Sequence, residues 1–84
     1  MKFTVVWKPS AKRDLATLWE AAEDWQAIAA AANGVQSQLT RAADRAGESR
    51  EGDDRIIFKG PLAVTYRVST TDRTAVVLQV RHIG

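Results

Sequence analysis

Cysteine is absent from this chain of 84 residues, and His82 is the single histidine. Without cysteine there are no disulfides and no thiol chemistry, so a reducing compartment is expected. One histidine leaves too few ligands for a structural zinc site, and we expect no metal and no cofactor. The chain also lacks a charged N-terminal region followed by an apolar stretch, and it has no apolar run of membrane-spanning length. We therefore expect a cytoplasmic protein without a membrane partner.

The residues that are present suffice for one small domain, which we expect to cover residues 1–84. Charge is distributed unevenly along it. Residues 1–54 carry seven Lys or Arg against nine Asp or Glu, whereas residues 55–84 carry five against one. The basic last third favours a polyanion such as RNA, or an acidic protein segment, as a partner.

Three β-strands are predicted over residues 55–59, 62–69 and 74–83, where residue type alternates with period two. The even positions are apolar or aromatic: Ile56, Phe58, Leu62, Val64, Tyr66, Val68, Val76, Leu78 and Val80. The cations occupy odd positions: Arg55, Lys59, Arg67 and Arg81. Because successive side chains point to opposite faces, we expect one face to bury the core and the other to present these four cations together. By the same alternation His82 points to the core side, unless the strand ends or twists near Arg81.

The first half of the chain predicts one strand and two helices. Residues 2–8 are rich in β-branched and aromatic residues, and Pro9 ends that strand and suits the first turn of a helix. Apolar residues recur with helical spacing over residues 10–23, and again to about residue 46 after a cap at Asp24. Asn33-Gly34 interrupts the second stripe, which resumes in phase, so one helix is expected. Residues 47–54 read as a loop. The fold class is therefore α+β, a twisted antiparallel sheet with both helices on its even-numbered face.

Several segments together resemble one family. They are Val5-Val6-Trp7-Lys8-Pro9-Ser10, Ala11-x-x-Asp14-Leu15, Gly47-Glu48-Ser49-Arg50, Arg55-Ile56-Ile57-Phe58, Pro61-Leu62-Ala63-Val64, Asp72-Arg73 and Val76-x-Leu78-x-Val80. With the order and length of the elements, they make the chain similar over its whole length to the RelE/ParE toxins of type II toxin–antitoxin systems. The resemblance implies the RelE-like arrangement β-α-α-β-β-β and a toxin held inactive by a cognate antitoxin.

The resemblance leaves the activity open between two branches of the family. RelE-like members cut mRNA, usually on the ribosome, with basic residues of the sheet, whereas ParE-like members lack that set and poison DNA gyrase. Where the nucleases usually carry an arginine in the middle strand, this chain has Ala63. The nucleases often place a tyrosine, or a histidine-tyrosine pair, after the last strand, where this sequence has Ile83 and Gly84.

Metal-independent RNA cleavage by attack of the 2′-hydroxyl needs a base, positive charge for the transition state and an acid. The predicted catalytic residues are Lys59, Arg67, Arg81 and His82, and the predicted RNA-binding residues are Arg55, Lys59, Arg67 and Arg81. Guanidinium groups pair with phosphate through two hydrogen bonds, and imidazole exchanges protons near neutral pH. On this basis an endoribonuclease, or mRNA interferase, is the preferred hypothesis.

The same residues fit other roles. The four cations can solvate an exposed sheet face, or bind acidic residues of an antitoxin. The alternatives are therefore a noncatalytic toxin that binds DNA gyrase, and an inactive module that only binds its antitoxin. Tyr66 is predicted to lie in the core with its hydroxyl at the edge. Three tryptophans are assigned to the core or to helix packing, with a partner surface for one of them as the alternative: Trp7, Trp19 and Trp25.

Overall fold

The computed structural model describes residues 2–83, which fold into two helices and a five-stranded sheet. The elements are β1 (Thr4–Trp7), α1 (Pro9–Ala21), α2 (Trp25–Ala46), β2 (Glu48–Ser49), β3 (Asp54–Lys59), β4 (Leu62–Ser69) and β5 (Thr74–His82). The predicted α+β class and the order of the main elements are confirmed. A short additional strand, β2, lies within the segment predicted to be a loop.

The sheet is mixed, in the order β1-β5-β4-β3-β2. Strands β3, β4 and β5 form the predicted antiparallel meander. Strand β1, however, pairs in parallel with β5, with Thr4 beside Thr74 and Trp7 beside Val77. The prediction of a wholly antiparallel sheet is therefore wrong. Parallel neighbours need a long crossover rather than a tight hairpin, and here both helices lie between β1 and the meander in the chain.

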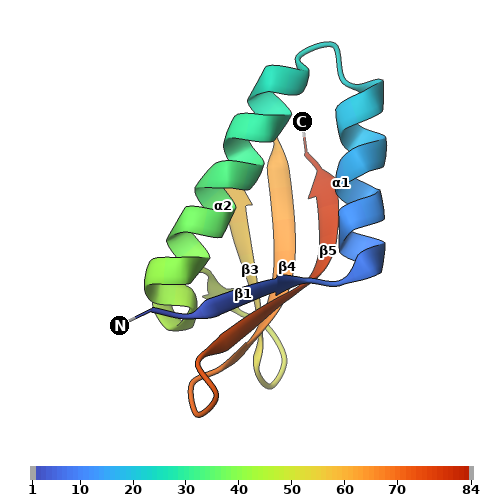
Figure 1. Cartoon of the computed structure of the whole chain (residues 1–84). Helices are drawn as coiled ribbons and strands as arrows, with labels where there is room; N and C mark the ends of the chain where they lie inside the picture. Colours follow the sequence, from blue (N-terminus) through green and yellow to red (C-terminus); the bar gives the residue numbers. More distant parts are fainter. Residues whose placement is uncertain (1, 84) are drawn as a thin grey trace.

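Both helices cover the same face of the sheet (Figure 1). Pro9 lies in the first turn of α1, and the Asp24 side chain caps α2 by accepting a hydrogen bond of 3.0 Å from the Ala27 N–H. Helix α2 runs through Gly34 without a break, as predicted. The helix is irregular instead near its C-terminus, at Ala42, whose φ of −156° and ψ of 50° are not helical.

The core fills the space between the helices and the sheet. Its fully buried large side chains are Tyr66, Ile28, Leu39, Leu62, Val35, Val64 and Val77. Helix α1 is fixed to the sheet edge by Asp14, whose carboxylate accepts a hydrogen bond of 3.3 Å from the Val80 N–H. Among residues 2–83, neither helix combines the length and apolar character needed to cross a bilayer.

Candidate functional site

The register of the meander decides which face each predicted site residue occupies. It pairs three residues of β3 with core residues of β4: Arg55 with Tyr66, Ile57 with Val64, and Lys59 with Leu62. Residues directly opposite each other on neighbouring strands point to the same face. Arg55 and Lys59 therefore lie on the helix-covered face, and the predicted even-odd division is wrong in β3.

Lys59 lies along helix α2. Its ammonium nitrogen is 3.5 Å from the Gln38 Oε1, and its aliphatic stem passes over Gly34. A Cβ at Gly34 would come within 2.8 Å of the Lys59 Cε, so the glycine makes room for this crossing. Long cationic side chains commonly lay their stems on apolar surface and keep the charge near water. A glycine in the interior of a predicted helix was the sequence signal for this close approach.

Arg55 is bound to the end of helix α2. Its guanidinium donates a hydrogen bond to the carbonyl of Gly47, the C-cap residue, while its Nε is buried and has no hydrogen-bond partner among the described residues. The carbonyls at a helix C-terminus lack partners within the helix and carry partial negative charge. Arg55 therefore stabilises the fold at this point.

A β-bulge at Leu78 changes the phase of β5. Thr65 lies opposite Gln79 while Tyr66 lies opposite Val77, so Leu78 has no partner on β4. Before the bulge the odd positions of β5 face the helices, and after it the even positions do. As a result Val76, predicted to lie in the core, is paired with Arg67 on the uncovered face.

Arg81 and His82 lie on opposite faces of the sheet. Arg81 is paired with Ala63 on the uncovered face, whereas His82 is paired with the buried Leu62. His82 borders a hollow beside the α1–α2 turn, near Leu18 and Asp24. The simple alternation placed His82 on the core side, and the structure agrees.

Arg67 already has a counterion on the uncovered face. Its Nε and a terminal nitrogen lie 2.7 Å and 3.3 Å from the two carboxylate oxygens of Asp54. This hydrogen bonding, together with the charge of Arg67, lowers the pKa of Asp54, and Asp54 raises the pKa of Arg67. The Arg67 side chain is exposed and that of Asp54 is partly buried, so solvent screens the pair and it serves mainly to orient the guanidinium.

The four predicted cations are thus divided between two faces, and the prediction of one shared basic face is wrong. We call the side of the sheet away from the helices the open face. It holds Arg67 and Arg81, while Arg55 and Lys59 point to the helix side, where Arg55 is partly buried and Lys59 is exposed. It also holds Phe58, which was predicted to be core and is 50% exposed.

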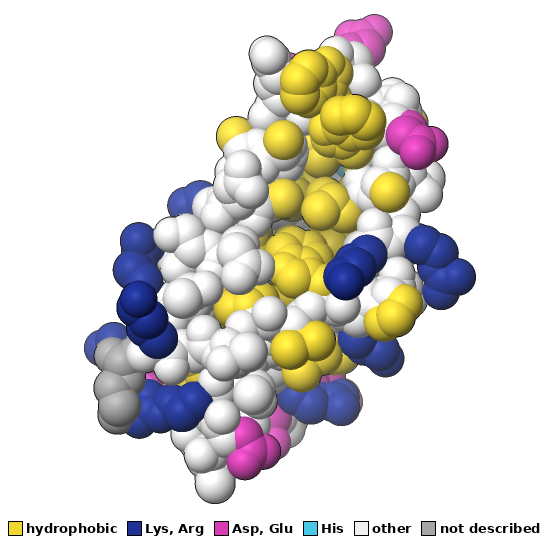
Figure 2. Space-filling model, viewed as in Figure 1, with side chains coloured by type: hydrophobic (Ala, Val, Ile, Leu, Met, Phe, Trp, Pro, Cys, Tyr) yellow, Lys and Arg dark blue, Asp and Glu magenta, His cyan; other side chains and the backbone are white. Residues whose placement is uncertain are grey.

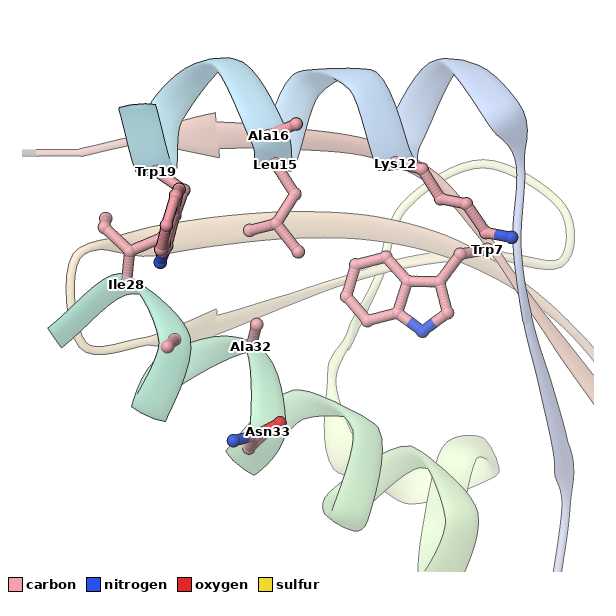
Figure 3. A pocket seen from close by; sticks show the side chains of 9 residues that line it. Trp7, Lys12, Leu15, Ala16, Trp19, Ile28, Ala32 and Asn33 are labelled. Carbon is pink, nitrogen blue, oxygen red and sulfur yellow. The ribbon is translucent and has the colours of Figure 1, made fainter. Parts of the chain in front are cut away.

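A second surface lies between the two helices. An apolar groove of about 510 Å³ opens there, and Figure 2 shows apolar side chains along it. Its lining residues come from β1, α1 and α2: Trp7, Lys12, Leu15, Ala16, Trp19, Ile28, Ala29, Ala32 and Asn33 (Figure 3). At the end near the helix turn, Trp19 and Trp25 stack edge to face with ring centroids 5.4 Å apart, and they are 45% and 47% exposed.

Trp7 closes the other end of this groove, where its indole N–H donates a hydrogen bond of 2.7 Å to the Gln36 Oε1. All three tryptophans therefore border one surface. Large exposed aromatic side chains in a groove are typical of a protein-binding site. Within residues 2–83 no three His, Asp or Glu side chains gather where they would hold a metal ion.

The chain is similar to solved structures over nearly its whole length. It shares 27% identity and a TM-score of 0.80 with a chain of the toxin–antitoxin complex RelBE2 from Mycobacterium tuberculosis, covering 98% of this chain and 99% of that one. A chain of the chromosomal ParDE system from P. aeruginosa gives 15% identity and a TM-score of 0.67, covering 99% of this chain and 98% of that one. The conserved hypothetical protein HP0892 from Helicobacter pylori gives 15% identity and a TM-score of 0.61, covering 95% of this chain and 93% of that one. No family model and no curated protein matches the sequence.

Proposed function

Because this chain is a RelE/ParE-type protein by fold and by sequence pattern, we propose that it is the toxin of a type II toxin–antitoxin pair in the cytoplasm. The single observation that carries this proposal is the full-length likeness to a chain of a RelBE2 toxin–antitoxin complex at 27% identity. Fold alone does not fix an activity, so the mode of action is argued from the residues.

The partner that holds the toxin inactive is a cognate antitoxin, and the groove between α1 and α2 is the surface that fits it best. The groove is apolar and is lined by the half-exposed Trp19, against which the half-exposed Trp25 packs. Lys12 lies at its rim and offers a positive charge to an acidic residue of the antitoxin. Apolar, aromatic-rich centres with charged rims are common in specific protein interfaces.

The geometry favours a toxin that acts by binding a protein, with DNA gyrase as the candidate target. RNA cleavage needs a base, an acid and positive charge around one phosphate. Here Lys59 and His82 lie on the helix-covered face, and Arg67 and Arg81 lie on the open face. The candidate proton-transfer groups are thus separated from the open-face guanidiniums by the sheet itself.

Endoribonuclease action is the second candidate. The likeness to the RelBE2 chain is stronger than the likeness to the ParDE chain, at 27% against 15% identity. Exposed Arg81 lies beside Gln79 on the open face, where both can reach a phosphate or a ribose. In this mechanism Arg67 and Arg81 would bind the RNA backbone, mRNA on the ribosome being the substrate.

One induction experiment distinguishes these functions. We expect expression of the chain alone to stop growth, and co-expression of the product of the neighbouring gene to restore it. For a gyrase-binding toxin, purified protein inhibits DNA supercoiling by gyrase, and mapped transcripts stay intact. Cut transcripts within minutes of induction, with supercoiling unaffected, would establish the endoribonuclease instead.

Two results would contradict the toxin assignment. One is normal growth at full induction of correctly folded protein. The other is the absence of any complex with the product of the neighbouring gene when the two are co-purified. A chain that forms the complex and leaves growth unaffected would be the inactive antitoxin-binding module.

A further inference from the structure

We propose that the open face of the sheet binds the toxin's protein target, with the Phe58 ring as the anchor of that interface. The inference rests on the proposed function and adds the place and the chemistry of target binding. It is carried by one group of neighbouring residues on that face, the Phe58 patch: Phe58, Ala63, Arg81 and Ile83.

The register brings this patch together from three strands. Phe58 of β3 is paired with Ala63 of β4, and Ala63 is paired with Arg81 of β5, so the three side chains form one row across the sheet. Ile83 follows two positions after Arg81, and its N–H donates a hydrogen bond of 2.8 Å to the Pro61 carbonyl. This bond extends the pairing of β5 with β4 by one residue, to Ile83 and Pro61. Because this bond continues the antiparallel pairing, strand alternation assigns Ile83 to the same face as Arg81.

Two of the three apolar members of the patch, Phe58 and Ile83, are exposed to solvent. Phe58 is 50% exposed and Ile83 is 38% exposed, whereas Ala63, which lies between Phe58 and Arg81, is 1% exposed. Ala63 is thus covered by the side chains around it, while half of Phe58 remains exposed to solvent. Exposed aromatic side chains at the centre of a patch are the residues that dominate binding free energy in protein interfaces.

The charge of the patch indicates what kind of partner it fits. Arg81 forms no ion pair within residues 2–83, whereas Arg67, two rows farther along the open face, is neutralised by Asp54. A nucleic-acid surface needs several cations that neutralise phosphates, and this patch has one. An apolar patch with a single free guanidinium instead fits a protein surface that offers an apolar recess beside a carboxylate.

A second copy of the chain fits this patch less well. A two-fold pairing centred on the patch would bring two Arg81 guanidiniums together in an apolar interface without an acidic partner, which is unfavourable. The patch also lies on the side of the sheet away from the α1–α2 groove, so the target and the antitoxin bind different surfaces.

The test compares variants at the two surfaces. Phe58→Ser and Arg81→Glu change the open face, and Trp25→Ser removes a similarly exposed aromatic from the helix side. We expect both open-face variants to need about thirtyfold more protein to stop growth, the loss typical of a central interface residue, with unchanged antitoxin affinity. Trp25→Ser should keep its toxicity and lose antitoxin affinity. Thermal melting shows that each variant is folded, and Arg81→Lys should retain part of the toxicity.

Each contrary result has a definite meaning. Full toxicity of folded Phe58→Ser would overturn the inference and leave the toxin assignment intact. Loss of antitoxin affinity in Phe58→Ser would assign the patch to the antitoxin, and a wild-type dimer that Phe58→Ser dissociates would assign it to self-association. Transcripts cut by the wild type and left intact by Phe58→Ser would assign it to RNA. A wild-type chain without toxicity would overturn the proposed function itself.

Discussion

Arg55 and Tyr66 face each other across β3 and β4, and both donate hydrogen bonds to carbonyls at the end of helix α2. The Tyr66 hydroxyl lies 2.7 Å from the Ala43 carbonyl, and the Arg55 guanidinium donates to Gly47. The last four carbonyls of a helix have no partner within it, so this pair of side chains completes the C-terminus of α2 from the sheet. Arg55, which was predicted to bind RNA, therefore makes a structural contact with the end of α2.

Removing the hydroxyl of Tyr66 should destabilise the protein without changing its shape. Tyr66→Phe leaves the buried ring in place but leaves the Ala43 carbonyl without its donor, at a cost of about 1 to 2 kcal/mol in the free energy of unfolding. Urea denaturation measures this cost. Thr40→Val is the control, because Thr40 donates to the Gln36 carbonyl at an exposed site. Equal unfolding free energies for Tyr66→Phe and the wild type would mean that the bond contributes nothing.

Substitution of Arg55 should lower the stability of the fold and leave growth inhibition unchanged. Arg55→Met keeps most of the aliphatic stem and removes the charged hydrogen bond to Gly47, which should cost about 1 to 3 kcal/mol of unfolding free energy. Growth inhibition by the folded variant should match that of the wild type. A loss of toxicity in a variant with unchanged stability would instead return Arg55 to the set of target-binding residues.

Two glycines should respond differently to the same substitution. At Gly47 a Cβ would lie 2.5 Å from the Ile56 carbonyl oxygen, which is backbone and cannot move aside. Gly47→Ala should therefore destabilise by about 1 to 3 kcal/mol. At Gly34 the Cβ meets only the flexible Lys59 side chain, and alanine favours the helix by up to about 1 kcal/mol.

Gly34→Ala should accordingly leave the melting temperature unchanged or raise it. Gly34→Ala should raise the melting temperature by more in a Lys59→Ala background, because the contact with the lysine stem is then absent. A double-mutant cycle measured by thermal melting checks this coupling between Gly34 and Lys59. Additive effects of the two substitutions would show that the lysine stem does not restrict this position.

The Asp54–Arg67 pair should make stability depend on acidity. Arg67 lowers the pKa of Asp54 below its ordinary 3.8, first through the hydrogen bonds and then through its charge. The folded state therefore favours the ionised carboxylate, and this contribution is present above the unfolded pKa and is lost as pH falls through the lower folded pKa.

Asp54→Asn should thus reduce the loss of stability that the wild type shows on acidification from about pH 5 to about pH 3. Urea midpoints at each pH measure the effect, and Asp53→Asn is the control with the same change in net charge. Parallel pH profiles for Asp54→Asn and the wild type would contradict a coupled pair.

Much of the fold could be predicted from residue pattern. Helical spacing identified α1 and α2, Asp24 was recognised as a cap, and alternation identified the meander and the buried Tyr66. These features depend on local sequence, because periodicity and capping act over one or two turns or a few strand residues. The likeness to RelE/ParE toxins likewise followed from short segments spread along the chain.

The faces of β3 and β5 were decided by the tertiary structure alone. Ile56 and Ile57 are both apolar, so alternation in β3 fits either face, and packing against α2 selected Ile57 for the core. In β5 the bulge at Leu78 shifts the alternation by one residue, which no periodic pattern reveals.

The amino-acid sequence by itself thus determined the two helices and the longer strands, though not β2, and which residues are chemically able to bind anions. Only the tertiary structure decided which of those residues share a surface. A strand's side of the sheet depends on its register with neighbours that are distant in sequence, and a one-residue shift moves every following side chain to the other face. For this reason two cations lie with helix α2, two lie on the open face, and a phenylalanine predicted to be core is exposed there.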